Sequence, residues 1–103
     1  MIGETASELA LTTAQRALVA TIVRETLADA EVYAFGSRTT GHARPHSDLD
    51  LLVVRAQALS LAERAALRDR FEHSDLPFRV DVVEQASLSG ATAQRVLAER
   101  VPL

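Results

Sequence analysis

The sequence predicts an α/β (α+β) fold, in which helices pack on a small mixed sheet with elements in the order α-β-β-α-β-α. Two kinds of periodicity support this prediction, because apolar residues recur at helical spacing in three segments and at strand spacing in three others. Hydrophobic residues make up 48% and charged residues 24% of the 103 residues, which is typical of a globular protein with one core. We therefore expect one domain over residues 1–103.

Capping motifs mark where two of the three predicted helices begin. Thr12 and Gln15 form one capping box, and Ser60 and Glu63 form a second. The predicted helices span residues 13 to about 29, 61 to about 72 and about 90–100. Pro102 follows the last helix and ends it. Residues 1–11 are mixed and small, so we expect them to form a frayed lead-in.

Segments rich in β-branched and aromatic residues predict the strands. They span residues 31–35, 49–54 and 78–83. The first two are joined by a short loop, so we expect them to be antiparallel neighbours. Alternation in the third strand places Phe78, Val80 and Val82 on one face of the sheet. Arg79, Asp81 and Val83 then lie on the other face.

The stretch between the first two strands carries a chemically informative pattern. Gly36 and Ser37 follow the first strand, ten residues separate Ser37 from Asp48, and Asp48-Leu49-Asp50 opens the second strand. Gly36 lets a ligand approach the backbone, and Ser37 adds a hydroxyl donor suited to an anionic oxygen. Residues two apart in a strand share a face, so the two carboxylates repel each other unless a cation separates them. The pattern predicts a phosphate loop followed by a pair of ligands for Mg²⁺.

Asp81 is a third acidic residue of interest. An acid inside an apolar strand is unfavourable without a partner, and two kinds of partner are open. One is a metal ion shared with the upstream pair, and the other is a salt bridge at an edge strand, on the side of Arg79. The upstream motif favours the first.

The loop over residues 41–47 holds further candidates. His42 and His46, with two aspartates nearby, raise the alternative of a zinc site, but no third soft ligand is evident. We therefore expect the imidazoles of His42 and His46 to be exposed to solvent. Arg38 and Arg44 are suited either to phosphate contacts or to a solvated loop surface, and the sequence leaves both open.

The ordered combination of strand, Gly-Ser, ten residues, Asp-x-Asp and apolar strand resembles the signature of nucleotidyltransferases of the DNA polymerase-β superfamily. The short chain is similar to the minimal nucleotidyltransferase (MNT) family, whose members often act as antitoxins to HEPN-domain toxins. The resemblance runs from about Thr13 to about Val101 and is strongest over residues 36–54. It implies a nucleotidyltransferase fold whose three aspartates converge on one sheet face.

The resemblance also implies roles for individual residues. The implied catalytic and metal-binding residues are Asp48, Asp50 and Asp81. The implied nucleotide-binding residues are Gly36, Ser37, Arg38 and Ser47. Two Mg²⁺ ions would assist transfer of AMP from ATP to a hydroxyl, a tyrosine of a HEPN-type toxin that forms a hetero-oligomer with this chain. Two alternatives stay open: a non-catalytic antitoxin that occludes its partner, and the catalytic subunit of an antibiotic-type nucleotidyltransferase with a small-molecule acceptor.

Composition narrows the function further. The net charge of −3 implies no general affinity for nucleic acid, which argues against a template-dependent polymerase. The chain has no cysteine, so disulfides and thiolate chemistry are excluded. No apolar run reaches the roughly 18 residues that span a bilayer, and residues 1–10 lack the basic start of a signal peptide. We therefore expect a cytoplasmic protein without membrane contact.

Overall fold

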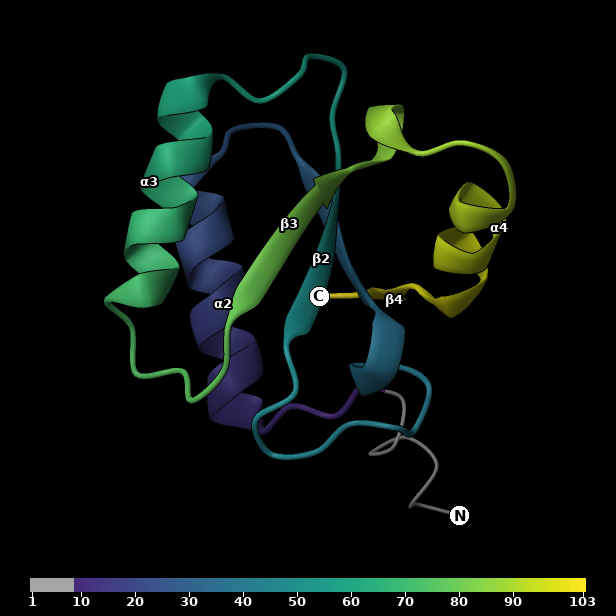
Figure 1. The fold of residues 1–103 in the computed structure, drawn as a ribbon. Coiled ribbons are helices and arrows are strands. Elements are labelled where there is room, and N and C mark those ends of the chain that lie inside the picture. The colour runs from purple at the N-terminus through teal and green to yellow at the C-terminus, as the bar shows by residue number, and fades with distance from the viewer. Residues whose placement is uncertain (1–8) are drawn as a thin grey trace.

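The computed structural model describes residues 9–103, and its elements follow the predicted order with one strand added (Figure 1). The helices are α2 (Thr13–Thr26), α3 (Leu61–Glu72) and α4 (Gly90–Glu99). The strands are β1 (Glu31–Phe35), β2 (Leu49–Val54), β3 (Val80–Glu84) and β4 (Val101–Pro102). Short 3₁₀ turns, η1 (Gly36–Arg38) and η2 (Gln85–Ser87), follow β1 and β3. The predicted α/β fold class is confirmed.

The four strands form one mixed sheet in the order β3-β2-β1-β4. β1 and β2 pair antiparallel, as predicted, and Phe35 lies opposite Asp50. β2 and β3 pair parallel, with Asp50 opposite Asp81, and α3 supplies the crossover that parallel neighbours need. The register therefore places Asp50 between Phe35 and Asp81, with both acids on the same face of the sheet.

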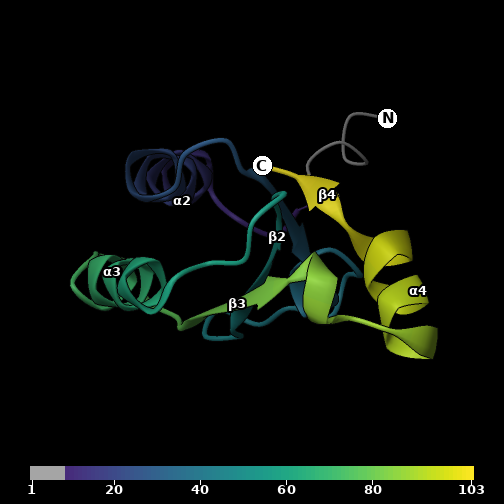
Figure 2. The same cartoon turned by 90° about the horizontal axis from the view of Figure 1, so that it is seen from above.

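The helices cover the two faces of the sheet unequally. α2 and α3 lie together on one face, while α4 alone lies on the other (Figure 2). The first face carries the larger core, which includes Ile22, Leu51 and Leu67. The second face carries a smaller cluster of Phe35, Leu52 and Val96. Asp50 shares this second face with Leu52 because side chains alternate along β2.

The predicted helix starts are confirmed, and one predicted helix end is wrong. Both capping boxes form, each with its two reciprocal hydrogen bonds. α2 ends at Thr26 rather than near residue 29, because Leu27 is already extended and its N–H donates to the Val23 carbonyl. Asp29 then turns the chain toward β1 with φ 55°. The last helix ends at Glu99, close to its prediction.

The C-terminal half of the sheet differs from the prediction in two ways. β3 begins at Val80 rather than at residue 78, because Phe78 packs instead under the guanidinium of Arg38, 4.1 Å from ring centroid to Cζ. β4 was not predicted, since it has two residues and one of them is Pro102. Proline is tolerated there because β4 lies at the edge of the sheet.

The start of the described chain also corrects a prediction. Residues 1–8 of the expected lead-in lie outside the described residues, but Leu9 is buried in the larger core. The Ala10 N–H donates to the Arg38 carbonyl over 2.7 Å. The segment over residues 9–11 is therefore packed rather than frayed. Within residues 9–103, no helix is both long enough and apolar enough to cross a membrane.

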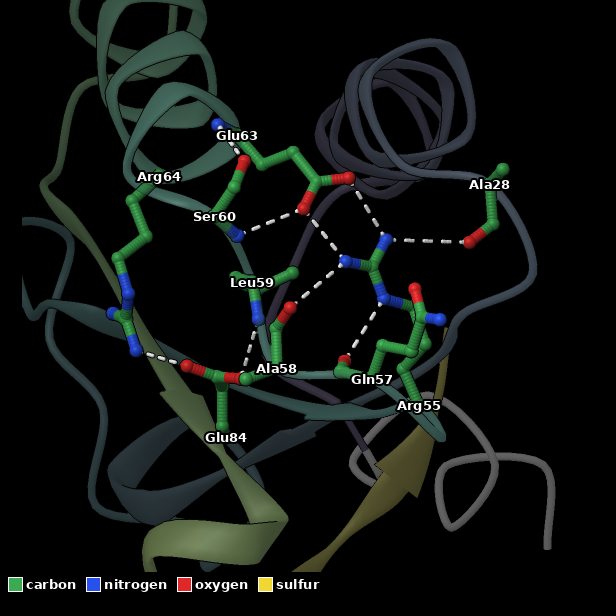
Figure 3. A network of polar contacts seen from close by, with 9 residues as sticks. All are labelled: Ala28, Arg55, Gln57, Ala58, Leu59, Ser60, Glu63, Arg64 and Glu84. Atoms are coloured by element: carbon green, nitrogen blue, oxygen red, sulfur yellow. Dashed lines mark hydrogen bonds and ion pairs between the residues drawn. The ribbon is translucent and has the colours of Figure 1, made fainter.

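A polar network joins the connection after β2 to α3 and β3 (Figure 3). Arg55 forms a two-pronged ion pair with Glu63, with N···O distances of 2.6 and 3.0 Å, and also donates to the Ala58 carbonyl. Glu84 accepts the Leu59 N–H over 2.8 Å and a hydrogen bond from the Arg64 guanidinium. The bonds from Arg55 and from the Ser60 backbone hold the pKa of Glu63 at about 2.

Candidate active site

The Gly-Ser turn brings the backbone directly against Asp50. Gly36 adopts φ +85°, a left-handed conformation that glycine reaches without strain. A Cβ at this position would clash with Oδ2 of Asp50. The Gly36 carbonyl accepts hydrogen bonds from the Thr39 N–H and hydroxyl, which bend the chain into the following loop. The 3₁₀ turn η1 starts at Gly36 itself and includes Ser37.

Asp48, Asp50 and Asp81 lie at one end of the sheet. Asp50 is half-buried on β2, Asp48 is exposed just before β2, and Asp81 is exposed on β3. Burial raises the pKa of Asp50, and the charges of Asp81 and Asp48 raise it further. In the described part of the chain, Arg95 is the cation that lowers this pKa. The structure thus brings the three predicted carboxylates close enough for their negative charges to repel one another.

This field is suited to a cation that also binds a substrate. Among residues 9–103, no three His, Asp or Glu side chains form a ready-made metal cluster. Mg²⁺ is usually held by one or two carboxylates together with substrate phosphates and water. The repulsion that raises the pKa of Asp50 is the repulsion that such an ion would relieve. The residues therefore fit Mg²⁺ that enters with a phosphate-bearing substrate.

An open cavity of about 400 Å³ lies between the acidic end of the sheet and α4. Its polar lining includes Asp50, Asp81 and Arg95, and its apolar lining includes Phe35 and Val96. Its volume lies within the range of small-molecule sites. The cavity therefore lies between two of the predicted acids, Asp50 and Asp81, and α4, a helix to which the sequence analysis assigned no functional role.

Arg38 holds the loop that leads to Asp48. Its side chain is 5% exposed, and its guanidinium donates to the carbonyls of Ala10, Pro45 and Ser47 at 2.6, 3.1 and 2.8 Å. The edge of the guanidinium is thus bonded to carbonyl oxygens, while the Phe78 ring packs against its plane. The alternative of a solvated surface charge is therefore wrong for Arg38, because its side chain is buried. The phosphate contact expected of Arg38 stays a prediction, and its contacts favour a role in shaping the loop.

The two predicted serines differ in their surroundings. Ser47 Oγ accepts the Arg44 N–H over 2.8 Å, so this side chain closes a turn just before Asp48. Ser37 lies in η1 with a partly exposed side chain, and its carbonyl accepts the His42 N–H over 3.2 Å. Ser37 is therefore placed beside Gly36, as the motif predicts, whereas Ser47 supports the loop. Nucleotide contacts of both residues remain predictions.

The loop histidines and Arg44 are exposed. The exposure expected for His42 and His46 is confirmed. Nδ1 of His46 lies 3.1 Å from the Pro77 carbonyl, and Nδ1 of His42 lies 3.1 Å from the Thr40 hydroxyl. No ligand cluster that would support the zinc alternative occurs in the described chain. Arg44 stays open between a phosphate contact and a solvated charge.

Two residues at the site were missed from the sequence. Glu99 Oε1 accepts the Gly36 N–H over 3.1 Å, and Nη1 of Arg95 lies 3.3 Å from the same oxygen. Arg95 and Glu99 are four residues apart, so the sequence could reveal them as a helical ion pair. Their link to Gly36 could not be found that way, because it depends on which face of the sheet α4 covers.

A Gly-Ser turn packed against one carboxylate of an acidic group, at the end of a mixed sheet, is the arrangement that the sequence predicted for a nucleotidyltransferase. The chain belongs to the nucleotidyltransferase domain family, whose model matches residues 17–103. A Haemophilus influenzae protein named "Probable protein adenylyltransferase MntA" is 39% identical over 83 residues, which cover 81% of this chain and 73% of that protein. The predicted resemblance to the minimal nucleotidyltransferases is confirmed.

Solved structures agree with this assignment. A toxin–antitoxin complex with AMP-PNP matches with a TM-score of 0.70 at 26% identity, covering 84% of this chain and 69% of that chain. A complex of a tri-AMPylated Shewanella oneidensis HEPN toxin with an MNT antitoxin matches with a TM-score of 0.59 at 25% identity, with the same coverage of 84% and 69%. The chain is thus similar in fold and sequence to proteins studied with a nucleotide analogue and with a toxin.

Proposed function

We propose that this protein is an antitoxin enzyme that moves AMP from ATP to a hydroxyl, most simply a tyrosine, of a HEPN-type toxin. The observation that carries the proposal is the contact of the Gly36 backbone with Asp50, beside Asp48 and Asp81. This arrangement offers a backbone turn to phosphates and carboxylates to a cation at the same place. Because ATP is the proposed donor and the toxin the proposed acceptor, we place the reaction in the cytoplasm.

The carboxylates and the Gly-Ser turn would bind different parts of the substrate complex. Asp48 and Asp50 would hold Mg²⁺, with Asp81 as a further ligand, and Gly36 and Ser37 would bind the β- and γ-phosphates. Bound Mg²⁺ supplies neutralisation of the negative charge that develops on the phosphates. Gly36 must remain a glycine for this role, because a side chain there would occupy the space that Asp50 uses.

The transfer itself exchanges one phosphorus–oxygen bond for another. The acceptor hydroxyl oxygen bonds to the α-phosphorus of ATP, the bond from that phosphorus to the bridging oxygen breaks, and pyrophosphate leaves. The hydroxyl proton passes to a carboxylate, and we assign this role to Asp81. Asp81 is exposed at the edge strand β3, so an acceptor presented by another macromolecule can reach it.

The test is intact-mass spectrometry on the cognate HEPN-type toxin after incubation with this protein, Mg²⁺ and each nucleoside triphosphate in turn. We expect the toxin to gain the mass of whole AMP units with ATP, and Asp48→Asn to abolish the gain. Asp69→Asn is the matched control, since Asp69 is an exposed acid on α3 that pairs with His73. A mass gain of the toxin with a different nucleoside triphosphate would show that the transferred nucleotide carries another base than adenine.

Failure of transfer would identify the alternatives. An unmodified toxin that is still silenced in a stable complex would replace the enzymatic proposal by occlusion. Asp50→Asn separates the two in cells, because it should abolish neutralisation under the enzymatic proposal and preserve it under occlusion. Turnover with a small-molecule acceptor, but none with the toxin, would indicate an antibiotic-type enzyme instead.

A further inference from the structure

Glu99 takes the Gly36 amide that the proposed function reserves for a phosphate. Its Oε1 accepts the Gly36 N–H over 3.1 Å, and its side chain is 21% exposed. Glu99 is the last residue of α4, where the helix dipole disfavours a negative charge. Its charge also adds to the repulsion at Asp50. The hydrogen bond from Gly36 therefore holds the Glu99 carboxylate in place, although the helix dipole and the nearby acids disfavour a negative charge there.

Arg95 is the second partner of the same oxygen. Its Nη1 lies 3.3 Å from Glu99 Oε1, and its side chain is 57% exposed and lines the cavity with Asp50 and Asp81. Arg38, by contrast, is buried and bonded to several carbonyls. Among residues 9–103, Arg95 therefore has one ion pair to give up, and that pair is long. Its position in the cavity with Asp50 and Asp81 lets it meet phosphates bound beside these acids.

We propose that Glu99 occupies the place of a nucleotide phosphate oxygen in the nucleotide-free protein, and that Arg95 passes from Glu99 to the phosphates when ATP displaces the carboxylate. The proposal rests on the proposed function, because it requires the triphosphate at Gly36. One N–H cannot serve both anions, and a triphosphate repels the Glu99 carboxylate. Arginine binds phosphate through paired donors, so the exchange replaces a weak contact by a stronger one.

Glu99 therefore lowers the affinity for nucleotide, and Arg95 raises it. The exchange gives the site a preference for ligands with a phosphate chain, since a nucleoside alone neither displaces the carboxylate nor engages the guanidinium. It also returns Glu99 to Gly36 when pyrophosphate leaves, which favours release of that product.

The test is the Kd for ATP with Mg²⁺, measured calorimetrically on the full chain without toxin. Glu99→Gln keeps the side-chain shape and should tighten binding roughly three- to tenfold. Arg95→Gln should weaken it roughly tenfold. In the double variant, Arg95→Gln should weaken binding by a larger factor than in the wild type, because no ion pair with Glu99 offsets the loss. Glu25→Gln and Arg70→Gln, which break an exposed pair between α2 and α3, are charge-matched controls and should leave Kd unchanged.

The outcomes separate this inference from the proposed function. ATP binding with an unchanged or weaker Kd in Glu99→Gln would overturn the inference and leave the nucleotide site standing. Absence of ATP binding to the wild type would remove both. If Glu99→Gln does not fold, the Gly36 amide resonance of the wild type decides: it should shift on adding ATP with Mg²⁺ and stay in place with adenosine. A resonance that does not move while ATP binds would also overturn the inference.

Discussion

The two ends of β2 and β3 carry opposite kinds of polar chemistry. Where the strands end, Arg55 and Glu84 are joined to Glu63 and Arg64, and each charge meets an opposite one (Figure 3). Where they begin, Asp50 lies opposite Asp81 in neighbouring strands. The same sheet therefore has one end where charges attract and one where they repel.

The difference separates residues that hold the fold from residues suited to chemistry. Bonds from Arg55 lower the pKa of Glu63 to about 2, which shows that the fold favours this charge. Burial and the neighbouring acids raise the pKa of Asp50, so the fold disfavours that charge. A charged group that lowers the stability of the fold and lies in a cavity is a candidate for binding or catalysis.

The largest expected effect is on AMP transfer. Asp50→Asn should lower the rate of toxin AMPylation by at least about 10³-fold, because it removes a carboxylate proposed to hold the cation. Glu63→Gln, at the other end of β2, should keep the rate within about threefold, since Glu63 bonds to Arg55 and to the Ser60 backbone, away from the three aspartates. Equal losses in both variants, measured by mass spectrometry of the toxin, would contradict the division between the two ends.

The next effect is on stability at the Gly-Ser turn. Gly36→Ala should lower the free energy of unfolding by about 2–5 kcal/mol, because it combines a left-handed backbone strain with a clash against Asp50. Gly41→Ala is the matched control: its φ of +82° is nearly the same, but nothing lies within 4 Å of the added Cβ. It should lose only about 1–2 kcal/mol in urea unfolding.

A double variant isolates the contact. In an Asp50→Ala background, the extra loss of Gly36→Ala over Gly41→Ala should disappear, because the clashing carboxylate is gone. If the excess persists, the backbone at Gly36 is restricted by something other than Asp50.

The sequence predicted the parts of this comparison that are local. The capping box of Ser60 with Glu63 and the order of Gly36, Asp48 and Asp50 depend on residues close in the chain. The site beyond them was not predictable in that way. Glu99 reaches Gly36 across 63 positions, and Arg38 is held by Ala10 and Phe78 from two other segments. Such contacts depend on tertiary packing, and propensity and periodicity carry no information about it.

The next smaller effect concerns the stability of the metal-free protein. In the presence of a chelator at pH 7, Asp50→Asn should raise Tm by roughly 2–5 °C, because it removes a charge that burial, Asp81 and Asp48 disfavour. Differential scanning calorimetry measures this directly. Addition of Mg²⁺ with a non-hydrolysable ATP analogue should reverse the order, because the wild type gains binding energy that the variant lacks. A lower Tm for the metal-free variant would mean that Asp50 stabilises the fold.

The smallest effect is the response of the two ends to acid, and its sign should be opposite at each. The pKa of Glu63 is lowered to about 2, so its stabilisation is present above the ordinary glutamate pKa and is lost as pH falls toward 2. The pKa of Asp50 is raised, so the native state binds its proton more tightly and the cost of its charge disappears as pH falls. In urea unfolding at a series of pH values, the wild type should have a higher free energy of unfolding than Glu63→Gln at neutral pH. This difference should shrink as pH falls below about 4.5. As pH falls, the free energy of unfolding of the wild type should approach that of Asp50→Asn, which is higher at neutral pH. If both differences move in the same direction, the two ends of the sheet do not differ in the way that their charges indicate.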